Sequence, residues 1–447
     1  MKLINNSLFE FSQKQITIIE TIGFFIIFTS IWGNHIISNY DFTKLIYIFD
    51  SMLLCVFFFV NNKHASKHKF TKALFMVEFF SLSLIIMGIR FELPGNIAQG
   101  IVIGIVFPIY YLSLKPNLFK SKINTIINSA SYSFYLLLIL SLVFAPNGDI
   151  RYRGILTNTN TLAEFASSIF LLSLYAALVN NKKKMAFNII TSILSGGVVF
   201  FTQSRAAILT IIVSCVIWGV YYLVFRKIQK IFRRILLIFI ASIVCVPILS
   251  FATSTLPFAV LSMEEELFDA HFLIYNYQYG SEYFDYNDEL GSNTDKINNR
   301  MTDFSSSGRS DLWKLYGAEI GLDGHDKPIE FNAQFRTAHN AYVQVAYSFG
   351  FLAGLALLLF NLYIGVISIK KNHFTEFSFF RLIIIVNFGM YSMVETVYFP
   401  FSQSIALLYW IIIVSLIRSD FDEVNISVCG NRASRMPGTS IPETGNR

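Results

Sequence analysis

Long apolar runs recur from end to end of this sequence, and they limit the folds available to it. About 20 consecutive apolar residues allow an α-helix to cross the hydrocarbon core of a bilayer. Because lipid offers no hydrogen-bonding partner to an exposed backbone, these runs predict an all-α integral membrane protein with about 12 transmembrane helices. The runs cover 16–33, 45–61, 73–89, 98–114, 125–145, 160–179, 185–203, 205–225, 235–255, 341–369, 382–398 and 404–418.

The composition excludes a soluble protein of this length. Hydrophobic residues make up 54% of the 447 residues, and charged residues make up only 14%. An ordinary soluble domain has about 25% charged residues. The net charge of +6 is consistent with nucleic-acid binding. In a membrane chain, however, such an excess usually belongs to loops that remain in the cytoplasm. We therefore expect a lipid bilayer, and no nucleic acid, as a partner.

Lysine and arginine between the runs predict the orientation of the helices. Five alternate connections contain 18 of these residues, whereas the short connections between them contain five. Basic connections remain in the cytoplasm, so both termini are predicted to be cytoplasmic, including a polar tail over 419–447 that we expect to be disordered. The basic connections are 61–72, 115–124, 180–184, 226–234 and 370–381, and the five residues on the other side are Lys44, Arg90, Arg151, Arg153 and Arg205.

One connection is much longer than the others and divides the chain. Residues 256–340 follow nine predicted spans in 1–255 and precede three in 341–418. They contain 15 acidic and 6 basic residues, a net charge of −9, so we expect one long extracytoplasmic loop. Two segments of the loop, 262–273 and 310–320, have the pattern of amphipathic helices. Such helices could lie on the outer bilayer surface or cover a cavity.

Polar residues cluster immediately before four of the predicted helices, all at the extracytoplasmic face. A helix N-terminus presents unpaired N–H groups and the positive end of the helix dipole, which favour an anion. An adjacent arginine adds a planar set of donors that matches phosphate oxygens. The pattern therefore predicts a diphosphate site at this face. The residues are Arg151, Arg153 and Asn160 before the sixth span, Arg205 before the eighth, Arg309 before the second amphipathic helix, and His339 and Asn340 before the tenth span.

Simpler roles exist for each of these residues. An arginine at an outer helix end often only anchors the helix at the lipid headgroups, and a histidine there often only makes an interface hydrogen bond. Arg205 lies so close to the apolar zone that a functional role is favoured, because ionisable groups are costly at that depth. Glu164 and Glu395, beside other spans, could pair with an outer arginine either as structure or as part of a site.

Four short segments contain most of these residues. They are RYRGILTNTNTLA (151–163), TQSRAAIL (202–209), GRSDLWKLYGAEIG (308–321) and HNAYVQVAYSFGFLAG (339–354). In this order, with a long outer loop before the His-Asn pair, they resemble the O-antigen ligase and O-antigen polymerase superfamily of bacterial surface-polysaccharide assembly. The sequence departs from many relatives at Ala353, where they have a glycine three residues after the motif glycine, here Gly350.

The resemblance implies a metal-independent inverting glycosyltransferase that uses no cofactor. Its donor would be a polyprenyl-diphosphate-linked glycan, whose diphosphate Arg205 and Arg309 would hold. His339 would be the general base on the acceptor hydroxyl, because a neutral imidazole can accept a proton at neutral pH. The outer face also lacks His, Asp and Glu at recognisable metal-ligand spacing. The residues implied in substrate contact are Arg153, Arg151, Asn160 and Asn340.

The acceptor separates two activities within the superfamily. A polymerase extends a growing lipid-linked repeat, whereas a ligase transfers the glycan to the sugar core of lipid A. Residues 151–160 look more like the polymerase-type relatives, for which a chain-length regulator would be a further partner. The site would lie on the extracytoplasmic side of the bacterial inner membrane. A flippase or other transporter is the alternative from another class, but internal repeats and midplane polar residues, which are common in transporters, are not evident in this sequence.

Overall fold

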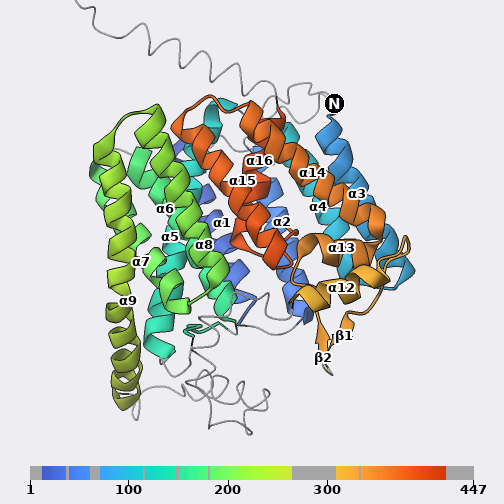
Figure 1. The fold of residues 1–447 in the computed structure, drawn as a ribbon, viewed down its shortest axis with the longest axis horizontal. Helices are drawn as coiled ribbons and strands as arrows, with labels where there is room; N and C mark the ends of the chain where they lie inside the picture. The colour runs from blue at the N-terminus through green and yellow to red at the C-terminus, as the bar shows by residue number, and fades with distance from the viewer. Residues whose placement is uncertain are drawn as a thin grey trace, which may run out of the picture.

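The chain folds into a bundle of long helices (Figure 1). Within the described residues, ten helices are long and apolar enough to cross a membrane, and two further apolar helices are shorter. The chain is therefore an all-α integral membrane protein, as the apolar runs predict. The computed structural model describes residues 13–36, 40–60, 71–113, 116–145, 151–156, 158–179, 182–263, 309–331 and 334–418.

The order of the helices follows the predicted spans, each of which coincides with one helix, apart from the tenth. The first part of the chain forms α1 (Gln13–Gly33), α2 (Tyr40–Val60), α3 (Lys72–Arg90), α4 (Pro94–Ser113), α5 (Pro116–Phe144), α6 (Thr159–Val179), α7 (Lys182–Thr202), α8 (Arg205–Val220) with a π-helical end η1 (Tyr221–Phe225), and α9 (Gln229–Met263). The second part forms α12 (Arg309–Glu319), β1 (Ile329–Phe331), β2 (Gln334–Arg336), α13 (Ala341–Phe349), α14 (Phe351–Lys370), α15 (Glu376–Val394) and α16 (Ser404–Ile417).

The prediction of one span over 341–369 is wrong, because this segment forms two helices. The chain breaks at Gly350, whose φ of +87° is a conformation that other residues rarely adopt. A Cβ atom at this position would lie 2.2 Å from the carbonyl oxygen of Leu322. The N–H of Phe351 donates to the carbonyl of Gly321 at 2.8 Å. Apolar residues continue across the break, so hydropathy alone does not reveal it.

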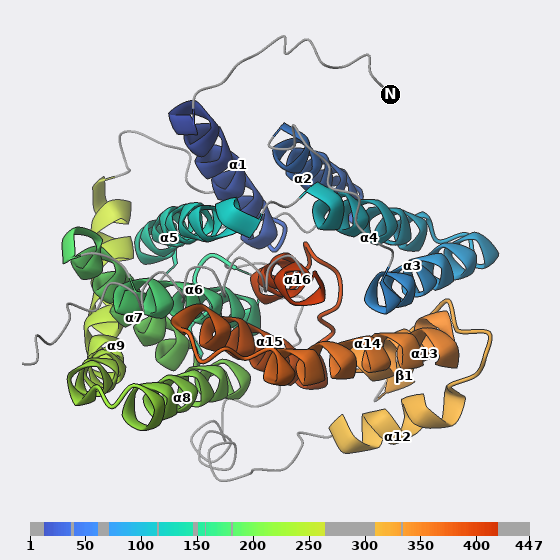
Figure 2. The same ribbon diagram turned by 90° about the horizontal axis from the view of Figure 1, so that it is seen from above.

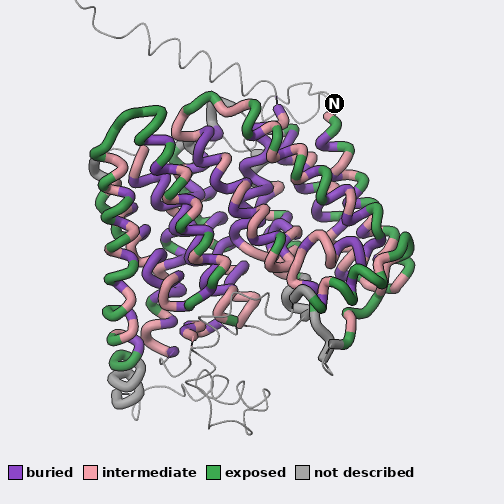
Figure 3. The backbone as a smooth tube through the Cα atoms, in the orientation of Figure 1, coloured by how far each residue is buried: buried purple, intermediate pink, exposed green. Residues whose placement is uncertain are grey.

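The last helix of the described residues, α16, lies in the middle of the bundle (Figure 2). All but one of its 14 residues are buried, and its neighbour α6 is buried throughout Thr161–Ala177. In contrast, α9 lies at the edge and exposes large apolar side chains, among them Leu237 (65%) and Phe251 (71%) (Figure 3). Apolar side chains at the edge meet lipid, whereas groups around α16 are surrounded by protein.

A non-helical connection, 395–403, leads from α15 into α16. Its residue Val397 is fully buried. Glu164 of α6 accepts hydrogen bonds from the N–H of Ile405 at 2.7 Å and from Ser404 Oγ at 2.8 Å. It thereby satisfies groups that the start of a helix leaves unpaired, and this is a structural role rather than a pairing with an outer arginine. Non-helical backbone of this kind is tolerated in a membrane protein where other segments cover it.

A small unit at the edge of the bundle is formed by α12, α13 and a two-stranded hairpin (Figure 1). The strands are antiparallel, with Ile329 opposite Arg336. The unit lies at the end of the bundle at which α8 begins. It therefore brings the segment before α13 to the same end as the starts of α6 and α8.

The predicted amphipathic helix over 310–320 is confirmed as α12. Its apolar residues Leu312 and Tyr316 are buried, and the Tyr316 ring packs edge-on against Tyr347 of α13 at 4.6 Å. The apolar face is thus covered by protein and does not lie on the bilayer. The other predicted helix, 262–273, begins with the last two residues of α9, and the rest of it, 264–273, lies outside the described residues.

Candidate functional site

A histidine and a glutamate pair at the start of α13. His339 precedes this helix with a φ of +48°, a conformation that is uncommon for residues other than glycine. Its Nδ1 lies 3.1 Å from Oε2 of Glu395, on the connection between α15 and α16. The two side chains are 40% and 17% exposed, so the pair is shielded in part yet open to a ligand from outside.

The same carboxylate contacts the first turn of α6. Asn160 Nδ2 donates to Oε1 of Glu395 at 3.2 Å. The side-chain oxygen of Asn160 accepts hydrogen bonds from Arg151 Nη2 at 2.9 Å and from Ser204 Oγ at 3.4 Å. These contacts join the starts of three helices, because Ser204 precedes α8 and His339 precedes α13. We call Arg151, Asn160, Ser204, His339 and Glu395 the polar network.

Arg151 also ties α7 to this network. Its Nε donates to the carbonyl oxygen of Thr202, the last residue of α7, at 3.1 Å. Arg153 lies two residues further along the same connection and is partly buried. Arg151 therefore has a structural role in joining the end of α7 to the start of α6. Contact of these two arginines with a substrate stays a prediction.

Arg205 is exposed and is the first residue of α8. The preceding residue, Ser204, has an extended backbone, and its hydroxyl donates to Asn160 instead of capping the helix. The first-turn N–H groups of a helix lack partners within the helix. An exposed guanidinium beside them is a suitable place for an anion. Arg205 thus adjoins the polar network through its neighbour in the chain.

The start of α12 is tied to the His339 segment. Arg309 is the first residue of this helix, and its side chain lies outside the described part of the structure. One turn later, Trp313 Nε1 donates to the carbonyl oxygen of Ala338 at 2.7 Å. The N–H of Ala338 in turn donates to Gln344 Oε1 at 2.8 Å. The residue before His339 is thus fixed on one side by α12 and on the other by α13.

Asn340 caps α13. Its side-chain oxygen accepts hydrogen bonds from the N–H groups of Tyr342 at 3.0 Å and Val343 at 3.1 Å. Its Nδ2 donates to the carbonyl oxygen of Met393, near the end of α15, at 3.2 Å. Asn340 therefore holds α13 against the segment that carries Glu395. The predicted contact of Asn340 with a substrate is a separate matter and stays a prediction.

This geometry can orient a base. When the Glu395 carboxylate accepts the N–H of Nδ1, Nε2 of His339 is the nitrogen that can take a proton. The carboxylate also stabilises the imidazolium that then forms. The helix starts at this end can bind an anion. In the part of the chain that the structure describes, no group of three or more His, Cys, Asp or Glu side chains could hold a metal ion.

A comparison with protein families identifies the central part of the chain. Residues 190–359 match the family model described as O-antigen ligase. This part of the chain belongs to the O-antigen polymerase and ligase superfamily. The superfamily match includes Arg205, Arg309 and His339 and confirms the resemblance seen in the sequence. A search of curated proteins gives no match.

The match and the helices together define the protein at a coarse level. It is a multi-pass bacterial membrane protein with a general role as an O-antigen polymerase or ligase. This role implies an enzyme of the membrane glycosyltransferase kind that acts on lipid-linked glycans. Asn160 and Glu395 lie outside the matched residues, so only the folded structure connects them with His339.

Sequence reasoning did not assign Glu395 to the site. It considered this residue only as a partner of an outer arginine, either as structure or as part of a site, whereas its partners in the structure include His339 and Asn160. One signal was present, because Glu395 is the only charged residue in 382–417. A single charge beside a membrane span is costly and tends to be kept for function.

Proposed function

We propose that this protein is a polymerase of O-antigen or capsular polysaccharide that joins polyprenyl-diphosphate-linked oligosaccharide repeats. The observation that carries the proposal is the contact between His339 and Glu395 at 3.1 Å. It lies at the end of the bundle where α8 and α12 begin with Arg205 and Arg309. A base and an anion site at one end are what transfer from a lipid diphosphate to a hydroxyl requires.

The reaction is a displacement with inversion at the anomeric carbon of the donor. The acceptor oxygen forms a bond to this carbon while the bond to the diphosphate oxygen breaks, and the diphosphate leaves with the bonding electrons. His339 takes the proton of the acceptor hydroxyl on Nε2, while Glu395 holds the ring through Nδ1. The acceptor is a growing lipid-linked repeat.

Arg205 and Arg309 hold the donor diphosphate in this proposal. Their guanidinium groups and the N–H groups of α8 and α12 stabilise the negative charge that develops on the leaving group. No metal ion is required, because the two arginines supply the positive charge. Arg151, Arg153, Asn160 and Asn340 are the further substrate contacts.

A ligase is the second candidate, and the description of the matching family model favours it. A ligase binds the same diphosphate and activates a hydroxyl in the same way, but its acceptor is the sugar core of lipid A. The likeness of 151–160 to polymerase-type relatives supports the polymerase. Deletion of the gene separates the two candidates. Loss of a polymerase shortens the surface glycan to one repeat, whereas loss of a ligase leaves long chains on the polyprenyl carrier.

The proposed chemistry can be tested by measuring glycan transfer by the purified protein, with a lipid-linked repeat as both donor and acceptor. His339→Ala should reduce turnover by about 10²–10⁴-fold while donor binding is retained, because general-base help acts on the acceptor. His373→Ala is the matched control, since this histidine lies in the connection between α14 and α15, at the other end of α15. Equal turnover of the two variants would contradict the role of His339. Loss of activity in EDTA, with recovery on adding a divalent cation, would exclude the metal-free reaction.

The site lies on the extracytoplasmic side of the inner membrane in this proposal, where a chain-length regulator is a further partner. The 18-to-5 distribution of basic residues supports this orientation. Single cysteines at Lys314 and Lys184, in a variant without native cysteines, test it in intact cells. An impermeant reagent should label the cysteine at 314 and spare the one at 184. The reverse pattern would overturn the orientation.

A further inference from the structure

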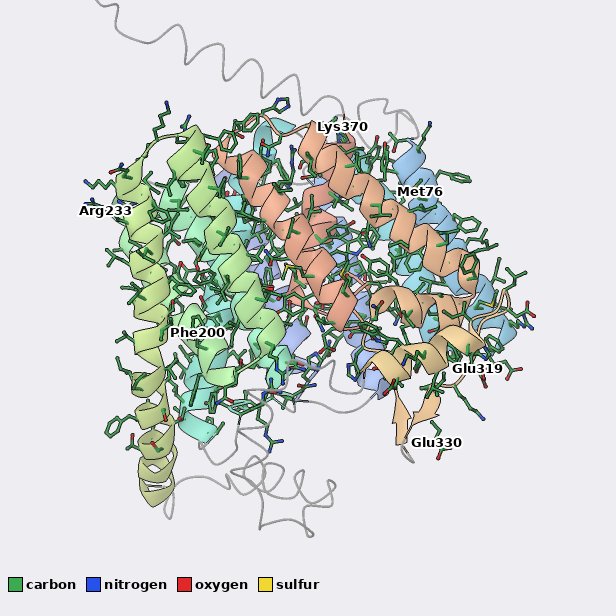
Figure 4. All side chains as sticks on the ribbon, viewed as in Figure 1. Met76, Phe200, Arg233, Glu319, Glu330 and Lys370 are labelled. Atoms are coloured by element: carbon green, nitrogen blue, oxygen red, sulfur yellow. The ribbon has the colours of Figure 1, made fainter. Side chains whose placement is uncertain are left out.

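Two connections meet at the end of the bundle opposite to His339. One follows η1 at the end of α8, and the other links α14 to α15. Arg226 Nη2 of the first connection lies 3.0 Å from Oε1 of Glu376, the first residue of α15 after the second connection. The hydroxyl of Tyr221 donates to the carbonyl oxygen of Phe374 at 3.2 Å. Figure 4 places Arg233 and Lys370 at this upper end, away from Glu330 at the lower end. The two connections therefore contact each other and share the surface at this end of the bundle.

This surface is strongly basic. Residues 226–234 and 370–376 together hold seven lysine and arginine residues and one acidic residue, Glu376. Because Glu376 pairs with Arg226, it offsets only one of the positive charges. Lys227, Lys230 and Lys370 are exposed. The seven basic residues are Arg226, Lys227, Lys230, Arg233, Arg234, Lys370 and Lys371.

Exposed aromatic rings accompany these charges. Phe225 and Phe374 are 46% and 52% exposed, and their ring centroids lie 4.7 Å apart. Phe374 has a φ of +52°, which is unfavourable for a bulky residue. Asn372 supports this conformation, since its side-chain oxygen accepts the N–H of Phe374 at 2.9 Å. Such strain is kept where the position of a side chain matters. We call the two rings and the seven basic residues the basic aromatic patch.

We propose that the basic aromatic patch binds the headgroups of anionic phospholipids. Phe225 ends the apolar span Arg205–Phe225, and Phe374 lies just before α15, so the rings lie at the boundary between lipid tails and headgroups. Lysine and arginine beside such rings attract phosphate groups, and each contributes about fivefold to the preference for an anionic surface. Charge complementarity thus selects an anionic lipid rather than a neutral one. This inference is independent of the proposed transfer reaction.

The proposal can be tested on the full-length protein in nanodiscs. The nanodiscs contain equal amounts of phosphatidylglycerol and phosphatidylcholine, and the protein is released from them for analysis. Native mass spectrometry should show preferential retention of phosphatidylglycerol. The double variant Lys227→Gln/Lys230→Gln should lower the ratio of the two retained lipids by about 25-fold. The matched control is Lys314→Gln/Lys327→Gln, which removes two exposed lysines at the opposite end and should keep the ratio of the unchanged protein.

A further variant separates the rings from the charges. Phe374→Asn tolerates a positive φ and removes one ring, so it should reduce retention of both lipids and leave their ratio intact. Equal retention of both lipids by the unchanged protein would overturn the proposal, and so would an unchanged ratio in Lys227→Gln/Lys230→Gln. Co-isolation of an acidic protein without a lipid preference would also overturn it. Size-exclusion profiles that match the unchanged protein show that each variant is folded.

Discussion

The two ends of the bundle both carry basic residues, but they use them differently. Near His339, Arg151 is bonded to Asn160 and Thr202, so its position is fixed by neighbours. At the opposite end, Lys227 and Lys230 stand exposed on a surface of like charge. The number of charges therefore does not identify the reactive end. Shared hydrogen bonds and partial burial at the His339 end support the proposed site there, because they fix the geometry that chemistry requires.

A third use of arginine occurs beside the basic aromatic patch. Arg381 and Arg418 are almost fully buried there. Arg381 Nη1 donates to the carbonyl oxygen of Ser415 at 3.3 Å, and Arg418 Nη1 donates to that of Tyr111 at 2.8 Å. Basic side chains at the last turn of a helix satisfy carbonyl groups that lack partners. These two arginines therefore stabilise helix ends instead of binding a ligand.

The largest effect should come from Glu395→Gln. The variant keeps the size of the side chain and a contact with Asn160, but it cannot stabilise an imidazolium at His339. Turnover should fall by about 10²–10⁴-fold with donor binding unchanged. Glu376→Gln, which neutralises a carboxylate at the opposite end, is the control and should keep turnover within about twofold. Equal turnover of Glu395→Gln and Glu376→Gln would show that the carboxylate near His339 has no greater role in the reaction than the one at the opposite end of the bundle.

Arg205→Lys should have the next largest effect. It keeps the positive charge but loses the planar pair of donors. If the diphosphate is held by two parallel hydrogen bonds, turnover should fall by about 10–100-fold, the value of one lost charged hydrogen bond. Arg233→Lys at the opposite end should have no effect on turnover. Full activity of Arg205→Lys at equal expression would show that Arg205 only anchors the helix at the lipid headgroups. Arg309→Lys can be interpreted in the same way.

Trp313→Phe should have a smaller effect. The substitution retains an aromatic ring and removes the hydrogen bond to Ala338, which is worth about 0.5–1.5 kcal/mol. We expect a loss of about two- to tenfold in kcat and faster hydrogen exchange in 338–344. KM for the acceptor should change less than kcat, because the bond fixes the base and not the acceptor. An unchanged exchange rate would show that α12 does not restrain this segment.

Acidification should have the smallest effect and should act outside the polar network. A hydrogen bond from Arg90 and the positive charge of that residue lower the pKa of Asp323. A lowered carboxyl pKa gives stability above the ordinary pKa, near 4, and this stability is lost as the pH falls through the lowered value. Protection factors for 321–324 should therefore drop below about pH 4. Asp323→Asn should show the reduced protection at every pH. Protection factors that do not change with pH in the unsubstituted protein would contradict the contact between Arg90 and Asp323.

The sequence predicted the helices and the residues at their starts, because both depend on local patterns. Arg205 begins one apolar run and His339 lies just before another, so their places follow from hydropathy and helix-end chemistry. The partners of Glu395 could not be predicted in this way. Its contact with Asn160 joins residues 235 positions apart, and such pairing depends on how the helices pack. The break at Gly350 was missed for another reason, since it leaves the apolar pattern intact.

The position of α16 has a consequence for assembly of the chain during synthesis. With 14 residues the helix is about 21 Å long, shorter than the apolar core of a bilayer at about 30 Å. It is also the last helix among the described residues, yet its start is held by Glu164, a residue translated 240 positions earlier. The contacts between Glu164 and the start of α16 can therefore form only after all the preceding described helices have been made. A stop codon before residue 404 would leave the carboxylate of Glu164 without the two donors that α16 brings.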